Sequence, residues 1–123
     1  MTLIIDTTED NFINLKLEGK ISIKRRVKAL RLQSEKLLPL ILNTLEKHNL
    51  TWSDLTLIKV AAQGGGFTSL PIGVLTANAL AYALKIPIED INGMKAIPFD
   101  GGAAVQPVYD SEPNIGIAVK NNC

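Results

Sequence analysis

The chain has one cysteine and few aromatic residues. Its single cysteine, Cys123, excludes a disulfide within the chain and is typical of a protein from a reducing, cytosolic environment. Aromatic residues make up only 5% of the 123 positions, whereas hydrophobic residues make up 46%. The length is that of one compact domain, whose core therefore has to be built from Leu, Ile, Val and Ala.

The sequence also lacks long apolar runs and any strong excess of charge. No run approaches the roughly 18 apolar residues that span a bilayer. The apolar start, Met1–Ile5, is interrupted by Asp6 and has no basic segment before it, so it does not indicate a signal peptide. A net charge of +1 points to neither nucleic acid nor a membrane as a binding partner. We expect a soluble cytoplasmic protein.

Apolar and polar residues alternate at the start of the chain, which predicts three strands. Thr2–Ile5 is a short apolar run typical of a buried strand. Apolar residues then alternate up to Glu18, and Gly19-Lys20 is typical of a hairpin turn before a second alternating segment that ends near Lys28. The pattern therefore predicts a three-stranded antiparallel meander.

Helices and strands alternate after this meander. We expect them at residues 34–49 (helix, with Ser34 as its cap), 55–62 (strand), 70–84 (helix) and 86–91 (strand). Layer packing and right-handed crossovers then predict an α/β fold in which the two later strands run parallel to the first. This is the connectivity of the ribonuclease H-like fold. Residues 1–91 are expected to form that lobe, and residues 92–123 an extended C-terminal tail or hairpin.

The turn after the first strand contains Asp6 and Thr7. A carboxylate at the end of a strand can hold a hydrated metal ion or orient a phosphate, so both residues are candidates for a phosphate loop. The alternative is a plain turn in which Asp6 accepts hydrogen bonds from its own backbone. The residues alone favour this alternative.

A glycine loop supplies further candidates for a phosphate loop: Gly64, Gly65, Gly66 and Thr68. Glycines leave backbone N–H groups open, and the N-terminus of a helix follows, which suits an anion. The alternative is a tight turn from strand to helix, capped by Thr68 or Ser69. General physical chemistry again favours the alternative.

Three segments carry recognisable motifs: Ile5–Thr8, Gln33–Pro39 and Gln63–Gly73. Together they resemble the TsaB (YeaZ) family. Members begin with a strand that ends in Ile-Asp-Thr-Ser/Thr, as Ile5–Thr8 does here. They carry a His-Ser-Glu-x-Leu-Leu-Pro helix start, matched by Gln33–Pro39, and a Gly-Pro-Gly-Ser-Phe-Thr-Gly-Leu-Arg-Ile-Gly loop, matched by Gln63–Gly73. The spacing agrees over roughly residues 1–91. Four residues stand where the family has His, Pro, Ser and Arg: Gln33, Gly64, Gly66 and Pro71.

The resemblance implies a single ribonuclease H-like lobe of the actin-like ATPase superfamily, with a mixed five-stranded sheet. It also implies a non-catalytic dimerisation subunit for the threonylcarbamoyladenosine modification of tRNA beside the anticodon. A TsaD-like catalytic subunit and a TsaE-like ATPase would be partners, and the chain alone would be a homodimer. Nucleotide and metal would lie on the catalytic partner, so the chain has no catalytic residue, metal or cofactor of its own.

The segment Pro107–Ile115 resembles the closing segment of full-length family members, in which a second lobe precedes it. Only a short linker precedes it here, which predicts that the second lobe has been lost. The rival interpretation of function is a residual nucleotide-binding domain that uses Asp6 and the glycine loop.

A basic run could contact tRNA phosphates: Lys24, Arg25, Arg26, Lys28 and Arg31. The alternative is a solvated strand edge that discourages association between sheets. No aromatic residue is interleaved with the run to stack bases, so the strand edge is favoured. The lone His48 is expected at a helix end, as a charge rather than a metal ligand.

The two predicted helices carry more apolar surface than one sheet can cover. On the first helix the apolar arc is about 200° wide, against the ~100° needed to dock on a sheet. The second helix is almost entirely apolar and has small residues four positions apart, which let another helix approach. Exposed apolar patches usually mark interfaces. We therefore expect a partner interface at Leu37, Leu38, Ile41, Leu45, Gly73, Ala77 and Ala81.

Overall fold

A computed structural model describes residues 1–61 and 69–91, which form a five-stranded sheet in the order β3-β2-β1-β4-β5. The strands are β1 (Thr2–Asp6), β2 (Phe12–Glu18), β3 (Ser22–Lys28), β4 (Leu57–Val60) and β5 (Ile88–Asp90). The meander β1-β2-β3 is antiparallel, whereas β1, β4 and β5 run parallel to one another. The predicted mixed five-stranded sheet is therefore confirmed.

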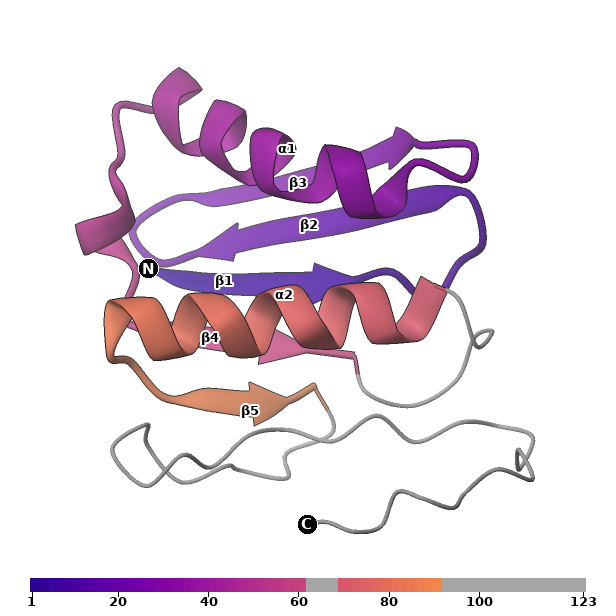
Figure 1. Cartoon of the computed structure of the whole chain (residues 1–123). Helices are drawn as coiled ribbons and strands as arrows, with labels where there is room; N and C mark the ends of the chain where they lie inside the picture. The colour runs from indigo at the N-terminus through magenta and orange to yellow at the C-terminus, as the bar shows by residue number, and fades with distance from the viewer. Residues whose placement is uncertain (62–68, 92–123) are drawn as a thin grey trace, which may run out of the picture.

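Both helices lie on the same face of this sheet (Figure 1). They are α1 (Gln33–Lys47), which covers β2, and α2 (Ser69–Leu84), which covers β1 and β4; a short 3-10 helix, Trp52–Asp54, precedes β4. This arrangement confirms the ribonuclease H-like connectivity. Neither helix is long and apolar enough to cross a membrane, within the residues described. The tail or hairpin predicted for residues 92–123 lies outside the described residues.

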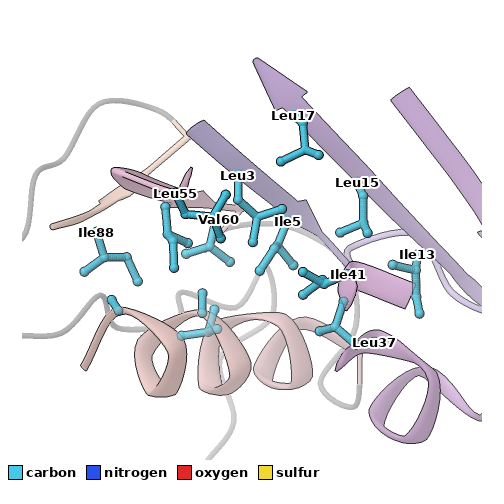
Figure 2. Packing of buried hydrophobic residues seen from close by; sticks show 14 of the residues in the cluster. Leu3, Ile5, Ile13, Leu15, Leu17, Leu37, Ile41, Leu55, Val60 and Ile88 are labelled. Atoms are coloured by element: carbon cyan, nitrogen blue, oxygen red, sulfur yellow. The ribbon is translucent and has the colours of Figure 1, made fainter. Parts of the chain in front are cut away.

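The core fills the space between the sheet and the two helices (Figure 2). Strand β2 shows how it is built, because its burial alternates residue by residue. Ile13, Leu15 and Leu17 are buried on the helix side, and the residues between them face the other way. Leu37 and Ile41 of α1 complete the packing, with 0% and 1% of their surfaces exposed.

The start of α1 differs from the prediction. The helix begins at Gln33, Leu32 occupies the N-cap position, and no side chain caps it, so Ser34 is not the cap. The buried side chain of Gln33 instead donates hydrogen bonds from Nε2 to the carbonyl oxygens of Phe12 (2.8 Å) and Glu9 (3.3 Å). These bonds tie the first turn of the helix to the β1–β2 loop.

The end of α1 also comes two residues earlier than predicted. His48 is the C-cap residue, and its Nδ1 lies 2.9 Å from the carbonyl oxygen of Thr44. Asn49 follows with φ 58°, a left-handed conformation that Asn adopts more readily than most residues. The predicted place of His48 at the helix end is confirmed.

Candidate functional site

The turn after β1 is closed by Asp6. Its Oδ1 accepts a hydrogen bond from the backbone N–H of Thr8 at 2.8 Å and another from the Thr8 hydroxyl. A carboxylate that bonds the backbone two residues later is typical of an Asx turn. The alternative reading of Asp6, as a residue that stabilises its own turn, is therefore confirmed.

Thr7, the other candidate in the turn after β1, is buried against α2. Only 1% of its surface is exposed, and its hydroxyl oxygen accepts a hydrogen bond from the Gly73 backbone N–H at 3.1 Å. The expectation that Thr7 lines an open phosphate loop is corrected, because its hydroxyl faces the chain's own helix. The remaining candidates for that loop, Gly64, Gly65, Gly66 and Thr68, lie outside the described residues.

The contact between Thr7 and Gly73 also explains why α2 carries a glycine. A Cβ added at Gly73 would lie 2.6 Å from the Thr7 hydroxyl oxygen and 3.4 Å from a methyl group of Ile5. Real Cβ atoms essentially never approach an oxygen so closely. The glycine thus lets the helix approach β1 of the same chain rather than a helix of a partner.

Most residues of the predicted partner interface lie in the chain's own core. The buried members are Leu37, Ile41, Leu45, Gly73, Ala77 and Ala81. The interface prediction is corrected at these six positions, because α1 and α2 contact each other and the sheet, and this packing uses most of the apolar arc. Leu38 alone remains accessible, with 47% of its surface exposed.

Other apolar residues do form an exposed surface on the helices. Leu75 and Tyr82 of α2 are 69% and 63% exposed, and Leu42 of α1 is 39% exposed. We call Leu38, Leu42, Leu75 and Tyr82 the outer helix face. The sequence carried a signal for this surface, because α2 has no charged residue over its 16 positions. A surface helix without charge is typical of an interface.

A contact between β3 and α1 shows which side of α1 faces the edge of the sheet. Arg25 donates hydrogen bonds from Nη1 to Asn43 Oδ1 (2.9 Å) and Thr44 Oγ1 (3.1 Å). This flank of α1 therefore faces the β3 edge of the sheet. At 100° per residue, Leu38 and Leu42 lie on the opposite flank, toward α2. The exposed leucines of α1 and the exposed side chains of α2 accordingly belong to one side of the molecule.

The other face of the sheet has no helix over it among the described residues (Figure 1). A hollow of about 440 Å³ opens on it, and we call this surface the open sheet face. Its lining comes from β1, β2 and β3 together with the last described residue: Ile4, Asp6, Asn14, Leu15, Lys16, Lys24, Arg25, Arg26 and Ile91. Among the described residues, no group of three His, Cys, Asp or Glu side chains could hold a metal ion.

The basic run divides between the two faces of the sheet. Lys24, Arg26 and Lys28 are exposed at alternate positions of β3, whereas the Arg25 side chain reaches α1. An aromatic residue does accompany these cations: the Arg26 guanidinium lies 3.7 Å from the centre of the Phe12 ring. Phe12 belongs to the neighbouring strand β2, so an aromatic ring lies beside the basic run although the run itself contains none.

Glu9 holds the Arg26 side chain in place. Its carboxylate accepts hydrogen bonds from Nε (3.0 Å) and Nη2 of Arg26, and from Nδ2 of Asn14 (3.2 Å). The bond from Arg26 is the main reason why the pKa of Glu9 lies below its ordinary value of 4.5, and the same bond raises the pKa of Arg26. This bidentate contact between Arg26 and Glu9 fixes the plane of the guanidinium.

Residues 27–119 match the model of one protein family, TsaD, described as tRNA N6-adenosine threonylcarbamoyltransferase. The chain belongs to this family. A relative from Bdellovibrio bacteriovorus with the same description is 32% identical over 95 residues, which are 74% of this chain and 28% of the relative. The protein TsaB of Bacillus subtilis, named for tRNA threonylcarbamoyladenosine biosynthesis, is 28% identical over 81 residues, 63% of this chain and 35% of TsaB.

A solved structure has the same fold. YeaZ from Pseudomonas aeruginosa superposes with a TM-score of 0.68 at 23% identity, over 73% of this chain and 42% of YeaZ. The similarity to TsaB confirms the resemblance predicted from the sequence, and YeaZ confirms the fold. The chain spans about a third of the length of the two curated relatives that it matches.

Proposed function

We propose that the chain acts in the threonylcarbamoyladenosine modification of tRNA, as a non-catalytic scaffold that binds a TsaD-like catalytic subunit. Two similar proteins support the pathway, since one is named as the tRNA N6-adenosine threonylcarbamoyltransferase and the other as a threonylcarbamoyladenosine biosynthesis protein. The motifs shared with TsaB support the scaffold role over the transferase role.

The outer helix face is the observation that carries this proposal. Two of its side chains, Leu75 and Tyr82, expose more than 60% of their surfaces on a helix without charge. Large apolar side chains that remain exposed in a folded chain become favourable when a partner covers them. The same face serves in a homodimer when the chain is alone and in a heterodimer when the catalytic subunit is present.

The turn after β1 supports a role without catalysis. The Asp6 carboxylate closes its own turn, and the Thr7 hydroxyl is buried against Gly73. These contacts already give both side chains a structural role. In the proposal, nucleotide and metal bind to the catalytic subunit, and a TsaE-like ATPase joins the same complex.

The test places a charge on the outer helix face. Leu38→Glu and Leu75→Glu should leave the fold intact, because both side chains are exposed, and should weaken capture of the TsaD-like subunit at least 100-fold. Burying an unpaired charge costs several kcal/mol, against about 8 kcal/mol for a micromolar complex. Ile21→Glu is the matched control, since Ile21 is 46% exposed in the β2–β3 turn and Leu38 is 47% exposed on α1.

The measurement is co-purification with the catalytic subunit from the same cell, together with light scattering and circular dichroism of the variants. The control should retain both the dimer and the complex. If both helix variants are folded and still capture the catalytic subunit as the wild type does, the outer helix face is not the interface.

A further inference from the structure

We propose that the open sheet face binds single-stranded RNA, with phosphates on the β3 lysines and a base stacked on Arg26. The inference rests on the proposed function only for the source of the RNA, a loop of the tRNA substrate. The RNA contact itself follows from the cations, the stacked guanidinium and the hollow on this face.

The cations form a row with a regular spacing. Lys24, Arg26 and Lys28 occupy alternate positions of β3, which lies at the edge of the sheet. Alternate residues of a strand are about 6.7 Å apart along a nearly straight line, whereas the phosphates of one duplex strand wind around the helix axis with a rise of about 3.4 Å each. An extended single strand spaces its phosphates more widely than a stacked one, so it suits this row better than a duplex does.

Two of the lysines repel each other in the free chain. Lys16 and Lys24 are directly opposite on neighbouring antiparallel strands, a position in which like charges are destabilising. Lys16 is partly compensated by an ion pair with Glu18 at 3.0 Å, but neither Lys24 nor Lys28 forms an ion pair with any other described residue. A phosphate between the strands would relieve this repulsion.

The guanidinium of Arg26 provides a stacking platform. One of its planes lies on the Phe12 ring, and the contacts with Glu9 keep it from rotating. The Arg26 side chain is still 54% exposed, so its outer plane is accessible. Unpaired bases stack on arginine planes and on aromatic rings in RNA-binding proteins. Arg26 can thus bind a base without breaking its ion pair with Glu9.

The hollow lies beside this platform. Its volume of about 440 Å³ falls in the range of pockets that hold small ligands. Ile4 supplies an apolar surface for the flat side of a base, and Asp6 and Asn14 supply polar groups for its edge. Lys16 and Lys24 line the same hollow, so a base in it would have its phosphate near both lysines.

The experiment measures fluorescence anisotropy of a labelled, unstructured RNA of about eight nucleotides, a length within the range of single-strand binding sites. Neutralisation of phosphate charge by three lysines, Lys16, Lys24 and Lys28, predicts a slope of about −2 for log affinity against log salt. A fourfold rise in salt should therefore weaken binding about 20-fold. Equal affinity for a duplex RNA of the same length, or no saturable binding at low salt, would overturn the proposal.

Three variants separate the contributions of the lysine–phosphate contacts, of net charge and of the stacked base to RNA affinity. Lys24→Gln with Lys28→Gln should reduce the salt slope by about 1.4, whereas Lys36→Gln with Lys47→Gln removes the same charge from α1 and should change it little. Arg26→Lys keeps the charge but removes the plane, so it should weaken binding at least about fivefold at an unchanged slope. Equal losses in the two double variants would indicate a net-charge effect and refute the site.

These outcomes are independent of the proposed function. The RNA measurement uses the full chain alone, and the scaffold test uses capture of the catalytic subunit. A chain that captures the subunit but does not bind RNA would overturn only the RNA proposal. A chain that binds RNA through this face but captures no subunit would overturn only the scaffold proposal.

Discussion

Replacing Gly73 with alanine should destabilise the fold, although the same change stabilises most helices. Gly73 lies in α2, where alanine is about 1 kcal/mol more favourable than glycine. An added Cβ would lie 2.6 Å from the Thr7 hydroxyl oxygen, which is itself buried beneath the helix. The sign of the effect therefore depends on whether this contact can relax.

The structure predicts that relaxation is costly. Extra methyl groups in a packed interior cost about 1–3 kcal/mol, and a disturbed hydrogen bond costs about 1 kcal/mol more. The Ile5 methyl group, 3.4 Å from the added Cβ, limits movement of the helix toward the other side. After subtraction of the propensity gain of about 1 kcal/mol, Gly73→Ala should lower the free energy of unfolding by about 1–3 kcal/mol.

Urea denaturation followed by circular dichroism measures this change, with two comparisons. Ala79→Gly, at an exposed position of α2, gives the propensity difference alone and should cost about 1 kcal/mol. Thr7→Ala combined with Gly73→Ala should be more stable than the sum of the single effects by about 1 kcal/mol or more, since the two residues are in contact. If Gly73→Ala is as stable as the wild type or more stable, the close packing of α2 on Thr7 is wrong.

Three further predictions concern the β1–β2 loop and the start of α1. The Glu9 carboxyl should titrate with a pKa below 4.5 in NMR measurements, because the hydrogen bond from Arg26 lowers this pKa. In Arg26→Gln the pKa of Glu9 should return toward 4.5. Since the folded-state pKa is lowered, the stability from this pair should be complete above pH 4.5 and lost as the pH falls through the lowered value. In urea denaturation, Gln33→Leu should cost about 1–3 kcal/mol because it removes a buried donor to the Phe12 carbonyl. Ser34→Ala should change stability by less than about 0.5 kcal/mol, whereas loss of a true N-cap typically costs about 1 kcal/mol.

The sheet could be predicted from the sequence because its signals are local. Alternation in β2 and β3 follows directly from burial of one face, and the hairpin turn between them fixes their register. The start of α1 could not be predicted in the same way. Its tether is a bond from Gln33 to the carbonyl of Phe12, 21 positions earlier, and only the folded chain brings the two together.

The stacking of Arg26 on Phe12 could not be predicted either, because the two residues are far apart in the sequence. The basic run contains no aromatic residue, and the run alone therefore favoured a solvated edge. The antiparallel register places Phe12 opposite Lys28 and Asn14 opposite Arg26, so the ring and the guanidinium meet across two strands. A pattern within one strand cannot show which side chains of the next strand lie beside it.

The two sides of α2 explain why the predicted interface residues were wrong while the helix remains a candidate for an interface. Small residues spaced by four, Gly73, Ala77 and Ala81, suit any close approach, and here the surface approached is β1 and β4 of the same chain. On the opposite side, Leu75 and Tyr82 leave 69% and 63% of their surfaces exposed. A helical wheel shows that both sides are apolar but cannot show which of them the chain's own sheet covers. The sheet covers the side of the small residues, so a partner of this chain should meet the leucine and the tyrosine.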